Sequence, residues 1–188
     1  IKLSSLKSLS ASRCGLGDEA LVLLCKELAS AAPPLESLDI SANPFGEAGS
    51  LALSDFLKSK ALPLATLDLS GSVESRATPL ALTALTEGIG MSELVHVTWR
   101  TACPAAAGRH AAHWGLLLAD HLSKNVSIGT LDLKGHCLGS DAPFALEPTS
   151  AGAMRESRLG GRLGGACRRH HALCTLNLSG CRMHDVGL

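Results

Sequence analysis

The stretch Ile128–Asp141, IGTLDLKGHCLGSD, decides the fold. Its apolar residues stand three, two and five positions apart, at Ile128, Leu131, Leu133 and Leu138. His136 is the polar residue between the last two. Leucines that alternate with polar residues predict a short strand with one apolar face. The same spacing recurs along the chain, so one strand-containing unit is repeated.

Six such frames start at regularly spaced apolar residues. These are Leu6, Leu35, Leu64, Leu94, Ile128 and Leu173, and the intervals between them are 29, 29, 30, 34 and 45 residues. A period near 29 residues leaves room for a true helix after each strand. The longest interval contains 142–157, APFALEPTSAGAMRES, which we interpret as an insertion because it includes Pro143 and Pro148. The whole chain, 1–188, is therefore expected to be one domain of about six repeat frames.

The position of His136 is taken in three other frames by Cys14, Asn43 and Cys181. A polar side chain there can satisfy backbone groups at the point where the chain leaves the strand. In the third frame the position holds Ser72, which we interpret as only a partial substitute, and in the fourth it holds Ala102. We therefore expect irregular turns after Leu69 and Trp99.

Apolar residues at helical spacing predict a helix after each strand. The expected ranges are Asp18–Ala31, Glu47–Lys60, Thr78–Gly88 and about Ala105–Lys124. In the first range four apolar residues form one stripe, acids open the helix and Pro33 closes the region. Asn125 is expected to end the fourth helix in the left-handed conformation. Cys167 is expected in the core, because it precedes Leu173 by the interval that separates Leu122 from Ile128.

The residues between the strand leucines are expected on the other face of a parallel sheet, in three columns. The first column is Ser8, Ser37, Thr66, His96, Thr130 and Thr175. The second is Ser10, Asp39, Asp68, Thr98, Asp132 and Asn177, and the third is Ser12, Ser41, Ser70, Arg100, Lys134 and Ser179. This face has no aromatic and only two long basic side chains, so we expect a poor high-affinity groove.

Composition narrows the classes of partner. The chain has 17 basic and 17 acidic side chains, so as a whole it does not attract nucleic acid or an anionic membrane. Aromatic residues make up 3% and Tyr is absent, which removes common binding anchors. No apolar run is long enough for a membrane helix, and the first ten residues lack a signal-peptide pattern. Seven cysteines at no framework spacing favour reduced thiols, and hence a cytoplasmic protein.

Two segments, Leu35–Gly49 and Leu122–Ala142, resemble the ribonuclease-inhibitor-like subclass of leucine-rich repeats. The resemblance covers nearly the whole chain and rests on the L-x-x-L-D-L-S core, the period, and the Gly-Asp and Gly-Glu pairs at 17–18 and 46–47. It implies an α/β leucine-rich repeat horseshoe, a solenoid with parallel strands on its concave face and helices on its convex face. Repeat arrays need polar caps and none is evident, so we expect a fragment of a longer array or a chain capped by partners.

Few groups in the sequence could carry chemistry. Two cysteines and two histidines form a zinc-like set, at Cys167, His170, His171 and Cys174. Four ligands on one straight helix cannot surround a metal, so we expect no metal site. Gly160–Gly165 lacks both the following Lys and the preceding strand of a phosphate-binding loop. Catalytic motifs are absent, so we expect neither enzyme activity nor a cofactor.

The strongest local charge lies beside the insertion, at Arg155, Arg158, Arg162, Arg168 and Arg169. Such a cluster is commonly a solvated helix face, and the alternative is a docking site for an acidic protein surface or RNA. We take these arginines as candidate partner-binding residues, together with the acids of the second column, Asp39, Asp68 and Asp132.

The expected function is a non-catalytic protein–protein interaction scaffold, a structural component of a larger intracellular assembly. The resemblance favours a cytoskeletal or ciliary setting, with proteins of a complex as partners and no small-molecule substrate. One alternative is the sensor repeat domain of a nucleotide-binding leucine-rich-repeat receptor. Another is a Ran-GTPase-activator-like protein, in which Arg13, Arg76, Arg100 or Arg182 would act on a nucleotide.

Overall fold

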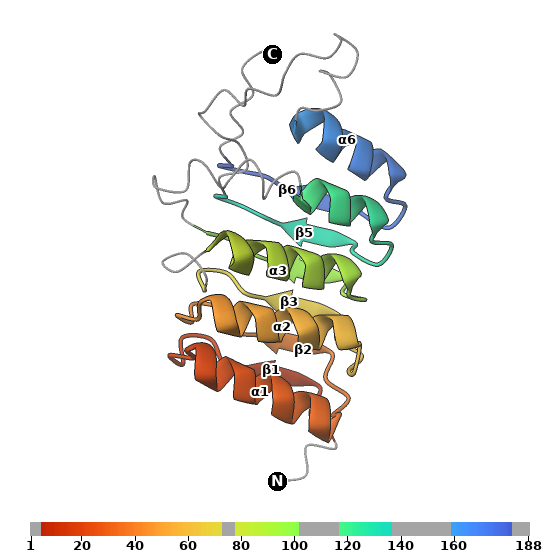
Figure 1. Cartoon of the computed structure of the whole chain (residues 1–188). Helices are drawn as coiled ribbons and strands as arrows, with labels where there is room; N and C mark the ends of the chain where they lie inside the picture. Colours follow the sequence, from red (N-terminus) through yellow and green to blue (C-terminus); the bar gives the residue numbers. More distant parts are fainter. Residues whose placement is uncertain (1–4, 73–77, 102–116, 137–158, 182–188) are drawn as a thin grey trace.

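The computed structural model describes residues 5–72, 78–101, 117–136 and 159–181. Six strands form one parallel sheet in chain order, and helices alternate with them (Figure 1). The strands are β1 (Ser8–Ser10), β2 (Ser37–Asp39), β3 (Thr66–Asp68), β4 (His96–Thr98), β5 (Thr130–Asp132) and β6 (Thr175–Asn177). The helices are α1 (Asp18–Ala31), α2 (Glu47–Ser59), α3 (Pro79–Met91) and α6 (Leu159–Arg169), and residues 117–124 are also helical. The predicted α/β class is confirmed, and the layout is compatible with a solenoid.

Each strand pairs with the strand of the next unit at the equivalent residue. Leu38 lies between Leu9 and Leu67, and Leu131 lies between Val97 and Leu176. Parallel neighbours need a crossover, and the helix between consecutive strands supplies it. The strand leucines and the inner sides of the helices meet in one apolar core. The predicted inward direction of these leucines is confirmed, since Leu38, Leu67, Val97 and Leu131 are all at most 1% exposed.

Two predicted helix ends need correction. The first helix has the predicted bounds, but α2 ends at Ser59 because Lys60 adopts a left-handed conformation with φ 49°. The third helix begins after Thr78, whose hydroxyl accepts the Ala81 N–H at 3.1 Å, and continues beyond the predicted end at Gly88 to Met91. Gly88 does not stop the helix. A Cβ there would lie 2.7 Å from the Ser54 Cα, so glycine is what allows α2 and α3 to pack closely.

The polar position after each strand joins neighbouring units, and we call its members the polar ladder. Its described donors to the preceding unit are Asn43, Ser72, His136 and Cys181. Asn43 Nδ2 donates to Ala11 O at 2.8 Å, and Ser72 Oγ donates to Ile40 O at 2.8 Å. Ser72 is a partial substitute, as predicted: its hydroxyl reaches the same carbonyl position of the preceding unit, whereas Asn43 Nδ2 also donates to Ile40 O and Ser41 O of its own turn. The predicted irregular turn after Leu69 is wrong for its described part, because Gly71 has the same left-handed conformation as Gly135 and Gly180, and the Ser72 N–H donates to Leu69 O at 3.3 Å as the His136 N–H does to Leu133 O. Most of the turn after Trp99 falls on 102–116, outside the described residues.

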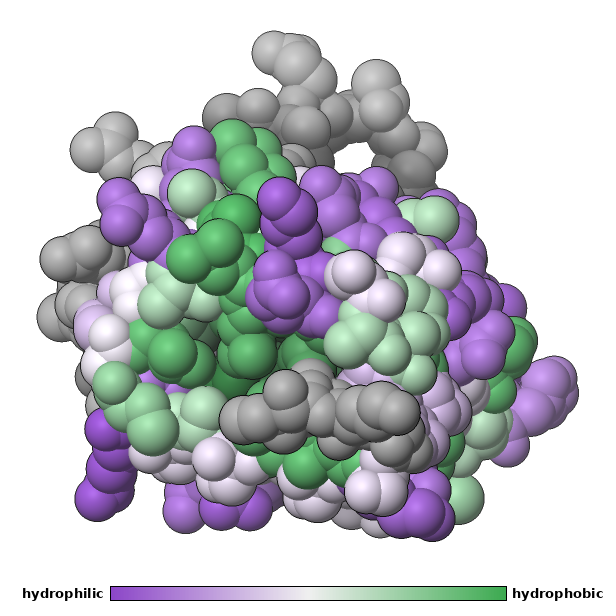
Figure 2. All heavy atoms as spheres, turned by 90° about the horizontal axis from the view of Figure 1, so that it is seen from below, coloured by the Kyte–Doolittle hydropathy of each residue, from purple (hydrophilic) through white to green (hydrophobic). Residues whose placement is uncertain are grey.

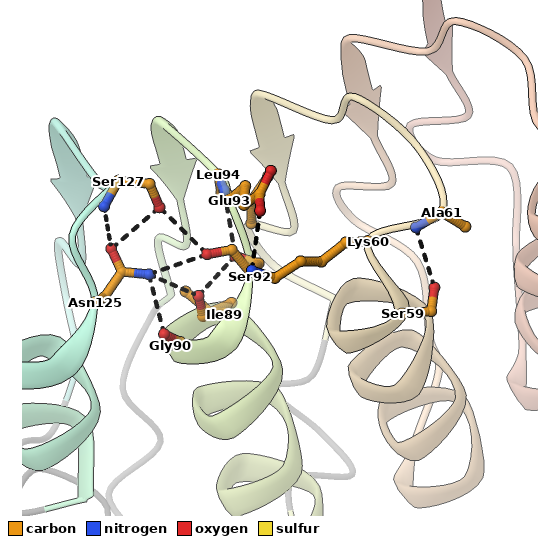
Figure 3. Close-up of polar contacts among 10 residues, drawn as sticks. All are labelled: Ser59, Lys60, Ala61, Ile89, Gly90, Ser92, Glu93, Leu94, Asn125 and Ser127. Carbon is orange, nitrogen blue, oxygen red and sulfur yellow. Dashed lines mark hydrogen bonds and ion pairs between the residues drawn. The ribbon is translucent and has the colours of Figure 1, made fainter.

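A second polar seam lies at the opposite ends of the strands, where helices turn back into the sheet (Figure 3). Asn125 Nδ2 donates to Gly90 O at 3.0 Å and to Ser92 O at 3.2 Å, and Asn125 Oδ1 accepts the N–H groups of Ser127 and Ile128 at 2.9 Å. Asn125 is not among the residues with positive φ, so the prediction of a left-handed Asn125 is wrong. Its amide instead satisfies carbonyls at the end of α3, the helix of the preceding unit.

The two ends of the array differ from its middle. Figure 2 looks at the end formed by α1 and β1, where apolar surface is visible between polar margins. Leu6, Leu9 and Leu16 of this end are only half-buried. Near the other end Cys167 is half-buried, whereas the adjacent Ala166 is 0% exposed. The prediction of a core Cys167 is therefore wrong, and Ala166 is the core residue. The predicted insertion, 142–157, lies outside the described residues.

Candidate functional site

The candidate site lies on the face of the sheet opposite the helices. Figure 1 places the helices side by side over one face, and the strand register arranges the side chains of the other in the predicted columns. The third column continues beyond the strand ends, where the hydroxyls of Ser12 and Ser41 lie 2.8 Å apart and the Arg100 N–H donates to Ser70 Oγ at 3.0 Å. The column prediction is therefore confirmed.

The three acids of the second column hold the backbone that follows each strand. One carboxylate oxygen of Asp39, Asp68 and Asp132 accepts the N–H two residues later, at 3.0, 2.9 and 3.1 Å. Asn177 does the same at 3.0 Å. Burial raises the pKa of Asp39, but hydrogen bonds from Ser41 and Ser10 outweigh it and bring this pKa below its ordinary value. The acid column is thus structural: Asp39 and Asp68 are half-buried and Asp132 is buried.

Arg100 and Asp132 form an ion pair across neighbouring units. Nε and Nη2 of Arg100 lie 2.8 and 2.7 Å from Asp132 Oδ2. The Asp132 side chain is 9% exposed and that of Arg100 is 57% exposed, so the guanidinium is anchored at one edge and open to solvent at the other. Burial raises the pKa of Asp132, but hydrogen bonds from Arg100 and the Lys134 N–H outweigh this effect and bring the pKa below its ordinary value.

A cleft of about 770 Å³ runs across this face at the carboxyl ends of the strands. Ligands of open parallel α/β sheets commonly bind outside the carboxyl ends of the strands. The cleft is floored by two adjacent columns. One is the third column, and the other, which we call the turn column, is the residue directly before each ladder position. The lining is Ser12, Arg13, Ser41, Ala42, Asp68, Ser70, Gly71, Arg100, Thr101, Lys134, Gly135, Ser179 and Gly180.

The turn column has a left-handed backbone in five of its six members. Their φ values are 55° at Arg13, 54° at Ala42, 68° at Gly71, 86° at Gly135 and 68° at Gly180. Glycine adopts this conformation without steric cost, which suits the three glycine positions. In the first five units the N–H group of this column donates to a carbonyl of the next unit, for example Arg13 N–H to Ser41 O at 3.0 Å and Gly135 N–H to Ser179 O at 3.0 Å. Side chains, and not free amides, must therefore recognise a ligand in the cleft.

Sequence reasoning missed this cleft because it stopped at the third column. A signal was present, since glycine directly precedes the ladder residue at Gly71, Gly135 and Gly180. Arg13 occupies the same position and was considered only as a nucleotide-acting arginine. Among those four arginines the structure brings Arg13 and Arg100 to the cleft, while Arg76 and Arg182 lie outside the described residues.

The predicted basic cluster is described only in part. Arg168 and Arg169 are exposed in the last turn of α6, whereas Arg155 and Arg158 lie outside the described residues. Arg162 belongs to α6, and its side chain is not among those described. The described arginines of α6 belong to the helix layer and Asp39, Asp68 and Asp132 to the sheet. The candidate residues therefore do not form one site.

The glycine-rich segment and the zinc-like set considered from the sequence belong to a helix, lie in the core or are exposed to solvent. Gly160–Gly165 is part of helix α6 and not a loop. His170 is buried with Nδ1 3.0 Å from the Leu173 N–H, and Cys174 donates to Ala172 O at 3.4 Å. Within the described ranges no three His, Cys, Asp or Glu side chains are grouped so as to hold a metal ion. A smaller hollow of about 20 Å³ beside Phe56 and Leu94 has room for about one water.

Comparison with known proteins does not extend this picture. In the part of the chain that the structure describes, no helix combines the length and the apolar character that crossing a bilayer requires. No protein-family model matches the sequence, and no curated protein matches it. The geometry of the sheet face therefore carries the functional argument by itself.

Proposed function

We propose that the chain is a leucine-rich repeat domain of the ribonuclease-inhibitor-like subclass that acts as a non-catalytic protein-binding scaffold. The period of 29 residues in the first frames, the polar ladder and the parallel sheet in chain order support this class. The helices would then cover the convex side of a horseshoe and the cleft would lie on its concave side. A small-angle scattering profile of the purified chain that fits a curved array would support this shape, and one that fits a flat slab would contradict it.

The observation that carries the function is the open face of the sheet with its broad cleft. Its described acids are engaged with the backbone, and Arg100 is engaged with Asp132, so these groups are held in fixed positions. The lining has no aromatic anchor of a high-affinity groove, but a fixed array of polar and charged side chains over several units suits charge-guided binding of a protein surface or segment. We place this activity inside the cell, in a cytoskeletal or ciliary assembly, because the subclass contains many such scaffolds.

Affinity isolation with the intact chain tests the proposal. A defined partner should be captured in a fixed ratio and should bind the purified chain saturably. One variant should change the cleft, with Arg13→Glu and Lys134→Glu, and a matched variant should change the helix layer, with Arg168→Glu and Arg169→Glu. Loss of the partner only in the first variant would place binding on the sheet face, and loss only in the second would place it on α6. Failure of the intact chain to bind any protein saturably would end the proposal.

A further inference from the structure

The charges that line the cleft are separated along the array. Arg13 belongs to the first unit, Arg100 to the fourth and Lys134 to the fifth, and all three side chains are exposed. Between them the floor is made of small residues, such as Ser41, Ala42, Ser70 and Gly71, with Asp68 as the acid of the lining. The cleft therefore has one cationic group in its first unit, two in its fourth and fifth units, and an acid with small side chains between them.

Arg13 stands where the backbone favours glycine. Its φ is 55°, and three equivalent positions in other units are glycine. The Cβ that would be added at Gly71 or Gly180 meets nothing closer than 3.8 Å, so these positions exclude side chains by conformation more than by space. A residue held in a disfavoured conformation, with its charge exposed in a cleft, is the kind of outlier from which a functional role is inferred.

The spacing of the cations defines a ligand. Strands of one sheet lie about 4.8 Å apart, so the first and fourth units are separated by about 14 Å and the first and fifth by about 19 Å. An extended chain advances about 3.3 Å per residue, so these separations correspond to about four and about six residues. An acidic protein segment with carboxylates at that spacing would match all three cations and would avoid Asp68 with uncharged residues between them.

On the basis of the proposed function, we infer that the cleft binds an extended acidic segment of a partner protein, laid across the strands. One carboxylate pairs with Arg13, and others, about four and about six residues away, pair with Arg100 and Lys134. Arg100 can bind while it stays anchored, because Nε and Nη2 contact Asp132, neither contact uses the third nitrogen of the guanidinium, and the side chain is 57% exposed. Asp132 therefore positions Arg100 for the ligand.

A labelled synthetic peptide tests this inference with the full chain. The probe is a Ser/Gly peptide with Glu at the first, fifth and seventh positions, and its binding is followed by fluorescence anisotropy at low and high salt. A peptide of the same composition with three adjacent Glu residues is the register control. We expect tighter binding of the spaced peptide, and binding that weakens as salt rises. Equal binding of both peptides, or none, would overturn the inference.

Two variants and one matched control assign the binding to the cleft. Arg13→Gly and Lys134→Gln should each weaken binding by about tenfold, the effect of losing one charge-assisted hydrogen bond. Arg169→Gln removes an exposed cation of α6 and should leave binding unchanged. Arg13→Gly should also raise the urea midpoint, because glycine adopts the left-handed conformation at this position without steric strain. Weaker binding by this variant therefore cannot be attributed to unfolding. Equal weakening by all three variants would show non-specific charge attraction and overturn the inference.

The peptide experiment can fail without contradicting the scaffold proposal. If the spaced peptide does not bind while the chain still captures its partner through another surface, the inference fails and the proposed function stands. If single-stranded RNA displaces the peptide at lower concentration than unlabelled peptide does, the cleft is a nucleic-acid site, which also overturns the inference. Loss of peptide binding in both cleft variants, with the α6 control unchanged, would support it.

Discussion

Asn43 shows how one side chain joins two units. Its amide donates to the carbonyls of Ala11 and Ile40 at 2.8 Å, and its oxygen accepts the Leu16 N–H at 3.0 Å, while the residue is 1% exposed. No water can replace these bonds at a fully buried site. Truncation would therefore leave several backbone groups unsatisfied, which is among the costliest kinds of substitution.

We expect Asn43→Ala to lower the free energy of unfolding by about 2–4 kcal/mol, as measured by urea denaturation. Cys14→Ala is the matched control, because Cys14 holds the same frame position but is exposed, and its described hydrogen bond is a long one to Ser12 O, at 3.5 Å. This control should change the stability by less than about 0.5 kcal/mol. Similar losses in both variants would contradict a specific role for the buried amide.

His170 makes the last unit sensitive to pH. Its Nδ1 accepts the Leu173 N–H at 3.0 Å, so this nitrogen carries no proton and the buried imidazole is neutral. Burial lowers the pKa of His170 below the ordinary 6.5, a backbone hydrogen bond opposes this effect, and the nearby His171 adds to it. The folded state thus binds fewer protons than the unfolded state, and its stability falls as the pH drops below about 6.5.

His170→Asn isolates this effect, because Asn125 occupies the equivalent position three residues before the first apolar residue of its frame. The urea midpoint of the natural chain should fall more between about pH 7.5 and about pH 5.5 than that of the variant. Equal falls would show that groups other than His170 carry the pH dependence.

At the scale of elements, the close packing of α2 and α3 depends on Gly88. A Cβ at this position would lie 2.7 Å from the backbone Cα of Ser54, which cannot move aside as a flexible side chain can. The predicted helix ended at Gly88, and glycine weakens helices, yet α3 continues to Met91. Packing overrode that local preference.

Gly88→Ala should therefore destabilise the chain by about 1–3 kcal/mol, although alanine is the better helix former. Gly164→Ala is the control: Gly164 lies within α6 and an added Cβ meets nothing within 4 Å. This change should be neutral or stabilising by up to about 1 kcal/mol. Urea denaturation of both variants compares the cost of the close contact at Gly88 with the gain from replacing a helical glycine by alanine. Stabilisation by Gly88→Ala would contradict the packing argument.

At the scale of the whole molecule, stability should depend on position along the array. Leu9 of β1 and Leu67 of β3 occupy the same place in their frames, but Leu67 is 0% exposed between two neighbours and Leu9 is half-buried at the end seen in Figure 2. In repeat arrays each unit is stabilised chiefly by the units on either side.

Leu67→Ala should cost about 2–5 kcal/mol and Leu9→Ala about 1–2 kcal/mol in urea denaturation. In the Leu67 variant, backbone hydrogen exchange should become faster in the units on both sides of β3. In the Leu9 variant, faster exchange should be confined to the first unit. If both substitutions lower the free energy of unfolding equally and speed up exchange over the same units, the described units unfold as one cooperative body, and the prediction is contradicted.

The repeat made much of this fold predictable from sequence. Alternating leucines gave the strand faces and the column positions, because a strand has only two sides. Helix ends and the cleft were harder. Lys60, Gly88 and Asn125 were misjudged because tertiary contacts and left-handed turns decided their roles. Arg13 reached the cleft through the backbone conformation of its turn, which a residue pattern alone does not fix.

The contact between Trp99 and His136 gives the fold a natural optical reporter. The two rings meet edge to face with centroids 5.2 Å apart, and His136 Nε2 lies 2.6 Å from Trp99 O, beside the backbone that leads to Arg100. The chain has two Trp and no Tyr, so replacing Trp114 by Phe would leave a single intrinsic fluorophore. Its emission would report, without any label, whether the fourth and fifth units remain joined under the cleft.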